Sequence, residues 1–289
     1  MTNEKNMKRV IIVGASSGLG LGVAEALASR GVPVGLAARH TKALEALKKL
    51  YPDKIEYMSI DVTHHGAGKL LSELIDKVGG MDIYFHAAGI ANLNEQELDP
   101  ENEAEIVRTN AEGFARMLSA AYNWFRSHDK AGQIAAITSV AGTNGIGHLA
   151  AYSASKRFDQ TYMVALEQLS NDQNAGIVFT DIRPGWVKTP LLNPDQSYPM
   201  EMTVAEVVPQ IIKAIVRRKR VTYLNWRWTL LADAWRCIPD SIWTRMNPTL
   251  STPVTTEAPV PELDKVLVSP EETETSSAET TTSAPAAEK

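Results

Sequence analysis

The sequence predicts an α/β fold built around a parallel, doubly wound sheet. Six short apolar runs alternate with segments whose apolar residues recur every three or four positions, which indicates buried strands joined by helices. A glycine-rich turn separates the first run from the first helix, and polar or glycine residues follow at the ends of the runs. Right-handed crossovers bring all strand ends to one edge of such a sheet, where ligands bind.

The expected strands cover residues 10–13, 32–38, 55–60, 81–86, 133–138 and 177–182, and a seventh covers 221–224. The expected helices follow residue 18, pass through 44–50 and 70–75, and cover 101–127, 150–176 and 203–216. These elements predict about seven strands in the order 3-2-1-4-5-6-7, with helices on both faces. The proline-containing segment 190–202 is expected to form a lid-like loop beside the site.

The turn after the first run has the spacing Gly14-x-x-x-Gly18-x-Gly20. Glycine lets backbone N–H groups approach a pyrophosphate, and the N-terminus of the next helix favours its negative charge. The second run ends at Ala38-Arg39, where NAD-selective sites place an acid that bonds the ribose 2′-hydroxyl. An arginine pairs instead with a 2′-phosphate. We therefore expect an NADP site; an ordinary tight turn and a solvated arginine are the alternatives.

A second motif carries groups for proton transfer. Tyr152 and Lys156 share one face of a predicted helix, and Ser139 precedes Tyr152 by thirteen positions. A phenol, an ammonium and a hydroxyl in this arrangement can hold a carbonyl oxygen and donate a proton to it. Between them, Ile146 and His148 are expected to face the substrate. Taken alone, Tyr152 and Lys156 could also be two half-exposed side chains on the surface of a helix, with no catalytic role.

Together these motifs resemble those of the short-chain dehydrogenase/reductase family over about residues 8–225. The resemblance implies a Rossmann-type fold and hydride transfer between NADP(H) and a ketone or secondary alcohol. It implies a catalytic set of Asn110, Ser139, Tyr152 and Lys156. The cofactor contacts it implies are Gly14, Ser16, Ser17, Gly18, Leu19, Gly20, Arg39, Asp61, Val62, Ala88, Gly89, Asn110, Tyr152, Lys156, Pro184, Gly185, Val187 and Thr189. His86 stands where the family usually has Asn.

The resemblance also assigns roles within this set. Tyr152 is the general acid, Ser139 holds the substrate oxygen, and Lys156 bonds the nicotinamide ribose and favours the phenolate. Asn110 positions a water that links Lys156 to solvent. Thr189 contacts the carboxamide of the nicotinamide. A homo-oligomer is also expected, and no metal site is expected.

Residues 224–246 combine apolar side chains at helical spacing with arginines. Leu224, Trp228, Leu231, Trp235, Ile238, Ile242 and Met246 form the stripe, flanked by Trp226, Leu230 and Trp243, and Pro239 is expected to break the helix. Eight basic and two acidic residues lie between Lys213 and Arg245. Three placements are open: peripheral contact with a membrane through 217–246, packing across the substrate pocket, or a subunit interface. The stripe favours a lipid-like substrate such as a 3-oxoacyl thioester, a steroid or a long-chain ketone.

The chain divides by composition into three parts. The catalytic domain is expected over 1–225 and the amphipathic extension over 226–250. Residues 251–289 contain thirteen Ser or Thr, five Pro and no aromatic residue, which predicts a disordered tail. The whole chain has a net charge of −5, and the tail alone has −6. Residues 1–250 therefore carry a net charge of +1, and no nucleic-acid surface is expected on them.

The compartment expected is the cytoplasm, with peripheral membrane contact as an addition. Cys237 is the single cysteine, and residues 1–9 are polar and lack the apolar core of a signal peptide.

Two other functions are open. A nucleotide-sugar epimerase or dehydratase shares Tyr-x-x-x-Lys but usually has another glycine spacing and a larger C-terminal domain. A non-catalytic NADP sensor or scaffold tends to lose the Tyr or the Lys, and both are present.

Overall fold

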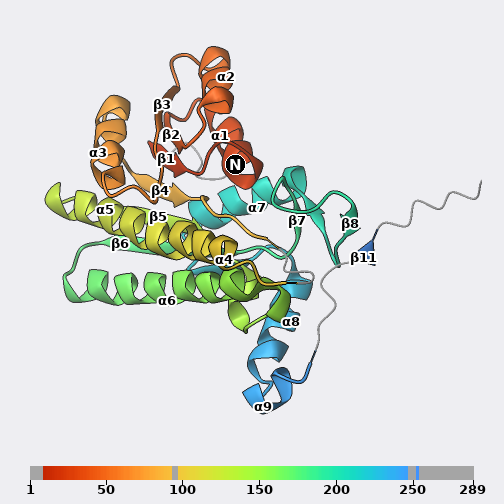
Figure 1. Cartoon of the computed structure of the whole chain (residues 1–289). Coiled ribbons are helices and arrows are strands. Elements are labelled where there is room, and N and C mark those ends of the chain that lie inside the picture. Colours follow the sequence, from red (N-terminus) through yellow and green to blue (C-terminus); the bar gives the residue numbers. More distant parts are fainter. Residues whose placement is uncertain (1–8, 93–96, 247–251, 254–289) are drawn as a thin grey trace, which may run out of the picture. The chain divides into compact units, whose positions relative to one another are not determined.

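The computed structural model describes residues 9–92, 97–246 and 252–253. Its main sheet contains the strands β1 (Val10–Val13), β2 (Val34–Ala38), β3 (Ile55–Ser59), β4 (Ile83–His86), β5 (Gly132–Ile137), β6 (Ile177–Arg183) and β10 (Val221–Tyr223). The helices are α1 (Gly18–Ala28), α2 (Lys42–Leu50), α3 (Ala67–Val78), α4 (Pro100–Val107), α5 (Gly113–Ser127), α6 (Ala150–Asp172), α7 (Val204–Val216), α8 (Trp226–Arg236) and α9 (Asp240–Trp243) (Figure 1).

All neighbouring strands of this sheet pair in parallel, in the order β10-β6-β5-β4-β1-β2-β3. Since β10 is the seventh strand of the sheet along the chain, the predicted order 3-2-1-4-5-6-7 is confirmed. So is the predicted α/β class. In the described part of the chain, four two-residue strands lie outside the main sheet: β7 (Val187–Lys188), β8 (Gln196–Ser197), β9 (Met202–Thr203) and β11 (Thr252–Pro253).

Alternate strand residues pack into two separate cores. Val10 and Ile12 belong to the core that residues of α1, α2 and α7 form on one face, whereas Ile11 and Val13 belong to the core under α3, α5 and α6. Successive side chains of a strand point to opposite faces, so a strand that is apolar throughout needs helices on both sides. This layering leaves the carboxyl ends of the strands as the uncovered edge, where the predicted site residues meet.

The helix expected over 101–127 is interrupted at its centre. A π-helical turn, Arg108–Glu112, separates α4 from α5 and contains Asn110. Within it the buried Asn110 side chain bonds Ile90 and Ser155. Single π turns inside α-helices are frequent at functional sites, and the extra residue changes where a side chain points. Just after it, a Cβ on Gly113 would lie 2.6 Å from Val62, so glycine permits the close packing of α5 here.

The segment 190–202, expected to be a loop, carries two short pairings. β9 pairs with β7 in parallel, and β8 pairs antiparallel with β11 (Thr252–Pro253). The Tyr198 ring packs on Trp186 with their centroids 4.7 Å apart. Helix α7 then begins as predicted after Thr203, whose side chain and Glu206 cap it reciprocally.

The segment 224–246 folds into two helices that meet near Pro239, as predicted. The side chains of Leu224 and Trp228 are buried, and Trp243 packs on Ile146 and Leu149. The Trp243 indole donates a hydrogen bond to the carbonyl of Gly145 at 2.6 Å. In the described residues no helix is both long and apolar enough to cross a membrane. The inner side of α8 and α9 therefore packs next to the loop that precedes Tyr152.

The predicted tail lies outside the described residues except for Thr252–Pro253, which form β11. The division of the chain at residues 225 and 250 stays a prediction.

Candidate active site

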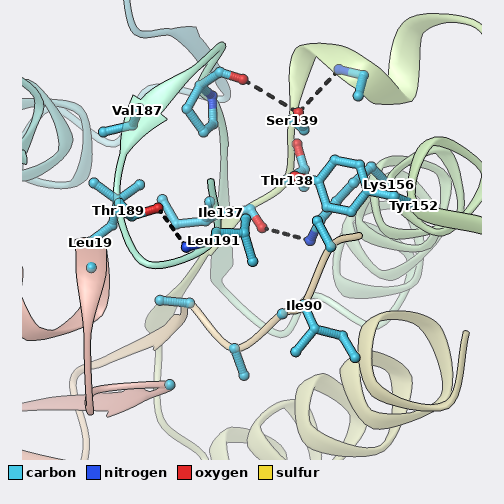
Figure 2. A pocket seen from close by; sticks show the side chains of 18 of the residues that line it. Leu19, Ile90, Ile137, Thr138, Ser139, Tyr152, Lys156, Val187, Thr189 and Leu191 are labelled. Atoms are coloured by element: carbon cyan, nitrogen blue, oxygen red, sulfur yellow. Dashed lines mark hydrogen bonds between the residues drawn. The ribbon is translucent and has the colours of Figure 1, made fainter. Parts of the chain in front are cut away.

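A cavity of about 460 Å³ opens at the carboxyl edge of the sheet. It runs from the glycine-rich turn at 14–19, past Tyr152 and Lys156, to Trp228 and Trp235 on α8. Figure 2 shows Tyr152 and Lys156 on one side of it, and Leu19 and Thr189 on the other. All the predicted cofactor residues line the cavity except Gly20 and Asn110, which are buried.

The first turn can be built only with glycine at two positions. Gly14 has φ +87°, and a Cβ there would lie 2.3 Å from the backbone nitrogen of Ala88. A Cβ on Gly20 would lie 2.1 Å from the carbonyl oxygen of Gly14. The turn is thereby held against the loop after β4, with the N-terminus of α1 facing the cavity. Such a cradle fits the pyrophosphate of a dinucleotide.

Arg39 and Asp61 lie at the same end of the cavity. The Arg39 side chain is 46% exposed, with one guanidinium nitrogen 3.9 Å from the Glu105 carboxylate. Asp61 accepts hydrogen bonds from the backbone and hydroxyl of Thr63 at 2.9 and 2.7 Å. Burial opposes the charged form of Asp61, but these bonds and the nearby Arg39 outweigh it and lower its pKa. The mouth of the cavity therefore holds a fixed carboxylate and an accessible guanidinium.

Tyr152 and Lys156 lie one turn apart near the start of α6, as expected. The Lys156 ammonium nitrogen is 5.9 Å from the centre of the Tyr152 ring. It donates to the carboxylate of Asp159 at 2.9 Å and to the carbonyl of Ile137 at 3.4 Å. Burial opposes the charged form of Lys156, but the negative charge of Asp159 outweighs it and raises the pKa of Lys156. The cavity wall therefore carries a fixed cation beside a phenol.

Ser139 follows β5 and caps the 3₁₀ helix η3 (Val140–Thr143). Its hydroxyl oxygen accepts from the backbone N–H of Ala141 at 3.1 Å and lies 3.5 Å from the carbonyl oxygen of Pro184 (Figure 2). The Gln160 amide holds the Ser139 carbonyl at 2.7 Å. Ser139 is thus a fixed hydroxyl that lines the same cavity as Tyr152.

The Asn110 amide is engaged in the protein interior. Its oxygen accepts from the backbone N–H of Ile90, and its nitrogen donates to the Ile90 carbonyl, both at 2.8 Å. The nitrogen also lies 3.1 Å from the Ser155 hydroxyl. A Cβ on Gly89 would be 3.4 Å from the Asn110 oxygen and 3.5 Å from the Lys156 nitrogen, so Gly89 lies beside both groups. The water-positioning role expected for Asn110 stays a prediction.

The loop after β6 closes the cavity opposite Tyr152. Pro184, Gly185, Val187 and Thr189 all line it, and the Thr189 hydroxyl accepts from the backbone N–H of Leu191 at 3.4 Å (Figure 2). A Cβ on Gly185 would lie 2.1 Å from the Trp228 indole. Gly185 is therefore the point where α8 approaches the site.

The substrate end of the cavity is apolar. Ile146 lines it as expected, whereas His148 is exposed and lies outside the lining, where Leu149 takes the place expected for it. The lining also includes Leu191, Leu192, Pro199 and Met200 of the segment expected beside the site, and Trp228, Leu231 and Trp235 of the apolar stripe, for which packing across the pocket was one of three open placements. Ala141 and Trp186 line it as well and were not expected there. The spacing of residues 228, 231 and 235 indicated an apolar helix face, but spacing alone could not show what that face would contact.

His86, which replaces the family's usual Asn, is completely buried at the end of β4. Its Nδ1 lies 2.8 Å from the Tyr84 hydroxyl, and its ring packs edge-on against Phe114. Burial, with a smaller contribution from the Lys156 charge, lowers the pKa of His86 to about 3. The imidazole is therefore a neutral structural group near the site.

Comparisons with known proteins agree with this geometry. Residues 8–199 match the family model described as short chain dehydrogenase. An uncharacterized oxidoreductase of Myxococcus xanthus is 32% identical over 247 residues, which are 83% of this chain and 96% of that protein.

Two solved structures share the fold. ElxO with NADP bound has a TM-score of 0.68 at 20% identity, over 78% of this chain and 99% of that one. A bulky-bulky ketone specific alcohol dehydrogenase of Comamonas testosteroni has a TM-score of 0.65 at 23% identity, over 83% and 95%. On the matched motifs, the fold and the relative's identity, the chain belongs to the short-chain dehydrogenase family of oxidoreductases.

Proposed function

We propose that the protein transfers a hydride between NADP(H) and a bulky, apolar ketone or secondary alcohol. The observation that carries this proposal is the single cavity that joins the glycine turn to Tyr152, Ser139 and the apolar end at Trp228. A dinucleotide and a carbonyl compound laid end to end in it would meet beside the phenol. Retention of Tyr152 and Lys156 speaks against the sensor and scaffold alternative.

NADP is the preferred cofactor in this proposal. Arg39 lines the cavity mouth directly after β2 and is exposed enough to bond a phosphate. No acidic residue follows β2 at the position used to bind a 2′-hydroxyl. The NADP bound in ElxO, a protein of the same fold, supports the same choice.

The chemistry assigned to the chain is proton transfer and charge stabilisation. When bound, the reduced nicotinamide supplies the hydride for the carbonyl carbon. The Tyr152 hydroxyl donates its proton to the carbonyl oxygen, on which negative charge grows. Ser139 holds that oxygen, and the Lys156 charge lies close enough to stabilise the phenolate left on Tyr152. In the reverse direction the phenolate takes the hydroxyl proton of the alcohol.

The apolar end of the cavity favours a bulky hydrophobic substrate. Three tryptophans and several aliphatic side chains line it, and few polar groups are available to bond a sugar or a charged group. This supports the expected lipid-like class of 3-oxoacyl thioesters, steroids and long-chain ketones. The ketone enzyme of Comamonas testosteroni is a further precedent for bulky substrates on this fold.

Tyr152→Phe tests the proposed reaction. We expect loss of at least about 100-fold in NADPH-dependent ketone reduction, the usual scale for a positioned general acid. NADPH affinity should change little, as measured by quenching of protein fluorescence. The activity screen should cover ketosteroids, 3-oxoacyl thioesters and long-chain ketones, with NADH in parallel. A variant that reduces ketones at nearly the wild-type rate would contradict the assignment.

Three other expectations stay predictions. Peripheral membrane contact through 217–246 is supported by the exposed apolar side chains of Trp226, Leu230, Ile242 and Met246. Binding to vesicles with anionic headgroups that is lost in Trp226→Ser/Leu230→Ser would support it, and absence of binding by the parent protein would contradict it.

A monomeric mass by light scattering would contradict the expected homo-oligomer. Cytoplasmic localisation is tested by cell fractionation.

A further inference from the structure

Residues 144–149, which we call the wall segment, join η3 to α6 and so lie between Ser139 and Tyr152 in the chain. The side chains of Ile146 and Leu149 are 5% and 3% exposed, and both residues line the cavity. A ketone that extends from Tyr152 into the apolar end would pass along these two side chains. The wall segment is therefore one side of the part of the cavity proposed to hold the substrate.

The wall segment contains two glycines that its packing does not require. Gly145 and Gly147 are exposed, and a Cβ on either would have no atom within 4 Å. Glycine leaves the backbone more conformations than any other residue, and this freedom is lost when the segment is ordered. From α6, the Ser153 hydroxyl accepts from the backbone N–H of Ile146 at 3.1 Å. Contacts with other elements must offset the remaining freedom of the segment.

The C-terminal helices supply such contacts through two tryptophans. The Trp243 indole donates to the carbonyl of Gly145 at 2.6 Å, and the Trp235 carbonyl accepts from the Asn144 amide at 3.0 Å. Trp243 is 8% exposed and belongs to the same buried cluster as the two apolar side chains of the wall segment. Its ring centre lies 5.3 Å from that of Trp235. The end of α8 and the end of α9 thus bond two neighbouring residues of the wall segment, and α9 also buries its apolar side.

The proposed catalytic residues on either side of the wall segment are held by other elements. From α6, the Gln160 amide bonds the Ser139 carbonyl at 2.7 Å. From α4, the Glu103 carboxylate accepts at 2.9 Å from the backbone N–H of the residue before Tyr152. Trp243 does not line the cavity that the described residues form, so it can act on a substrate only through the wall segment. Loss of Trp243 should therefore loosen the wall segment and leave the catalytic hydroxyl and phenol in place.

We infer that Trp243 is a positioning residue that fixes the wall segment, so that the preference of the enzyme for bulky over small ketones depends on it. A bulky ketone gains affinity from the apolar area that it covers, which requires Ile146 and Leu149 to stay in one place. If the wall segment is loose, binding must also order it, and this costs conformational entropy. A truncated ketone that ends near Tyr152 lacks these contacts and loses little. The inference names a specificity-determining residue of the proposed reaction and rests on that reaction.

The test compares Trp243→Phe and Trp243→Ala with Trp226→Phe. Phenylalanine keeps a ring and removes the indole N–H, alanine removes both, and Trp226 on α8 is a tryptophan that is 69% exposed. Far-ultraviolet circular dichroism checks folding. Asn144→Ala, which removes the bond to Trp235 from the other side, replaces any Trp243 variant that does not fold.

The first measurement is amide hydrogen exchange by mass spectrometry in the cofactor-free proteins. Exchange in peptides that cover 144–149 should be about threefold faster in Trp243→Phe and about tenfold faster in Trp243→Ala, since a single hydrogen bond is lost in the first and the packing as well in the second. Peptides from β5 should stay within about twofold of the parent protein, and Trp226→Phe should exchange like the parent throughout.

The second measurement is steady-state kinetics with the best bulky ketone of the activity screen and a truncated analogue that keeps the same reacting carbonyl. In Trp243→Ala the KM for the bulky ketone should rise about tenfold, while its kcat, the kcat/KM for the analogue and the affinity for NADPH stay within about twofold. Unchanged exchange, an equal loss with both ketones, or faster exchange with unchanged kinetics would each overturn the inference. If the parent protein reduces no ketone, the proposed function fails, and the exchange rates still decide whether Trp243 holds the wall segment.

Discussion

At the residue scale, the position of Arg39 at the cavity mouth predicts a preference for NADPH over NADH. Arg39→Ala removes the one guanidinium at the cavity mouth that follows β2, and a charge-assisted hydrogen bond contributes about 1.5–3 kcal/mol. We expect the KM for NADPH to rise at least about tenfold, with the KM for NADH within about twofold of wild type. Steady-state kinetics with both cofactors measures this. Arg126→Ala, on the exposed side of α5, is the matched control. Equal losses with both cofactors, or strong preference of the parent protein for NADH, would remove this role.

The residues predicted from the sequence were those with a fixed place in a motif. Gly14, Ser139, Tyr152 and Lys156 follow strand ends or helical spacing, so topology alone brings them to one cavity. Asp159 has no such mark, because an acid three positions after a lysine is usually a solvated helix pair. Its burial depends on how α6 packs on β6.

At the scale of elements, the first strand–turn–helix unit predicts different costs for two glycines. Gly14 and Gly31 have φ of +87° and +80°, so alanine at either position has a similar conformational penalty. Only at Gly14 does a Cβ collide with backbone, at Ala88; at Gly31 nothing lies within 4 Å. We expect Gly14→Ala to lose about 1–3 kcal/mol more unfolding free energy than Gly31→Ala, by urea denaturation, and to lose NADPH binding as well. Equal losses would show that the contact with Ala88 is not what requires glycine.

The features that could not be predicted well from the sequence are those whose position depends on tertiary contacts. The periodicity of apolar residues correctly predicted which segments form strands and helices. The predicted boundaries differ from the observed ones by a few residues. Helix α6 stops at Asp172 rather than near Gly176 because Asn174 and Gly176 adopt positive φ. The π turn at Asn110 leaves no mark in apolar spacing, because it forms where the amide can bond Ile90. The apolar stripe of α8 was visible, but its partner at Gly185 lies some forty positions earlier and could not be identified from spacing.

At the scale of the whole molecule, the fold places two buried groups with opposite pH behaviour around Lys156. The pKa of His86 falls from 6.5 to about 3, so between these values the unfolded chain binds a proton that the folded one does not. Stability from His86 is therefore lost as pH falls through this window. The pKa of Asp159 rises from 3.8 to about 6, so the folded chain binds the extra proton between these values. Stability from Asp159 is therefore gained as pH falls, and the two contributions oppose each other.

This opposition predicts the pH dependence of two variants. His86→Asn removes the group that destabilises the fold in acid and restores the residue usual in the family. Between pH 6.5 and pH 4.5 its unfolding free energy should gain about 2 kcal/mol relative to wild type, since each pH unit corresponds to about 1.4 kcal/mol per proton. Asp159→Asn should lose stability relative to wild type over the same interval, because its gain on acidification is gone. Urea denaturation followed by tryptophan fluorescence at several pH values measures both slopes. Parallel curves for all three proteins would mean that neither side chain is held in a shifted state by the fold, and that the polar groups around Lys156 are open to water.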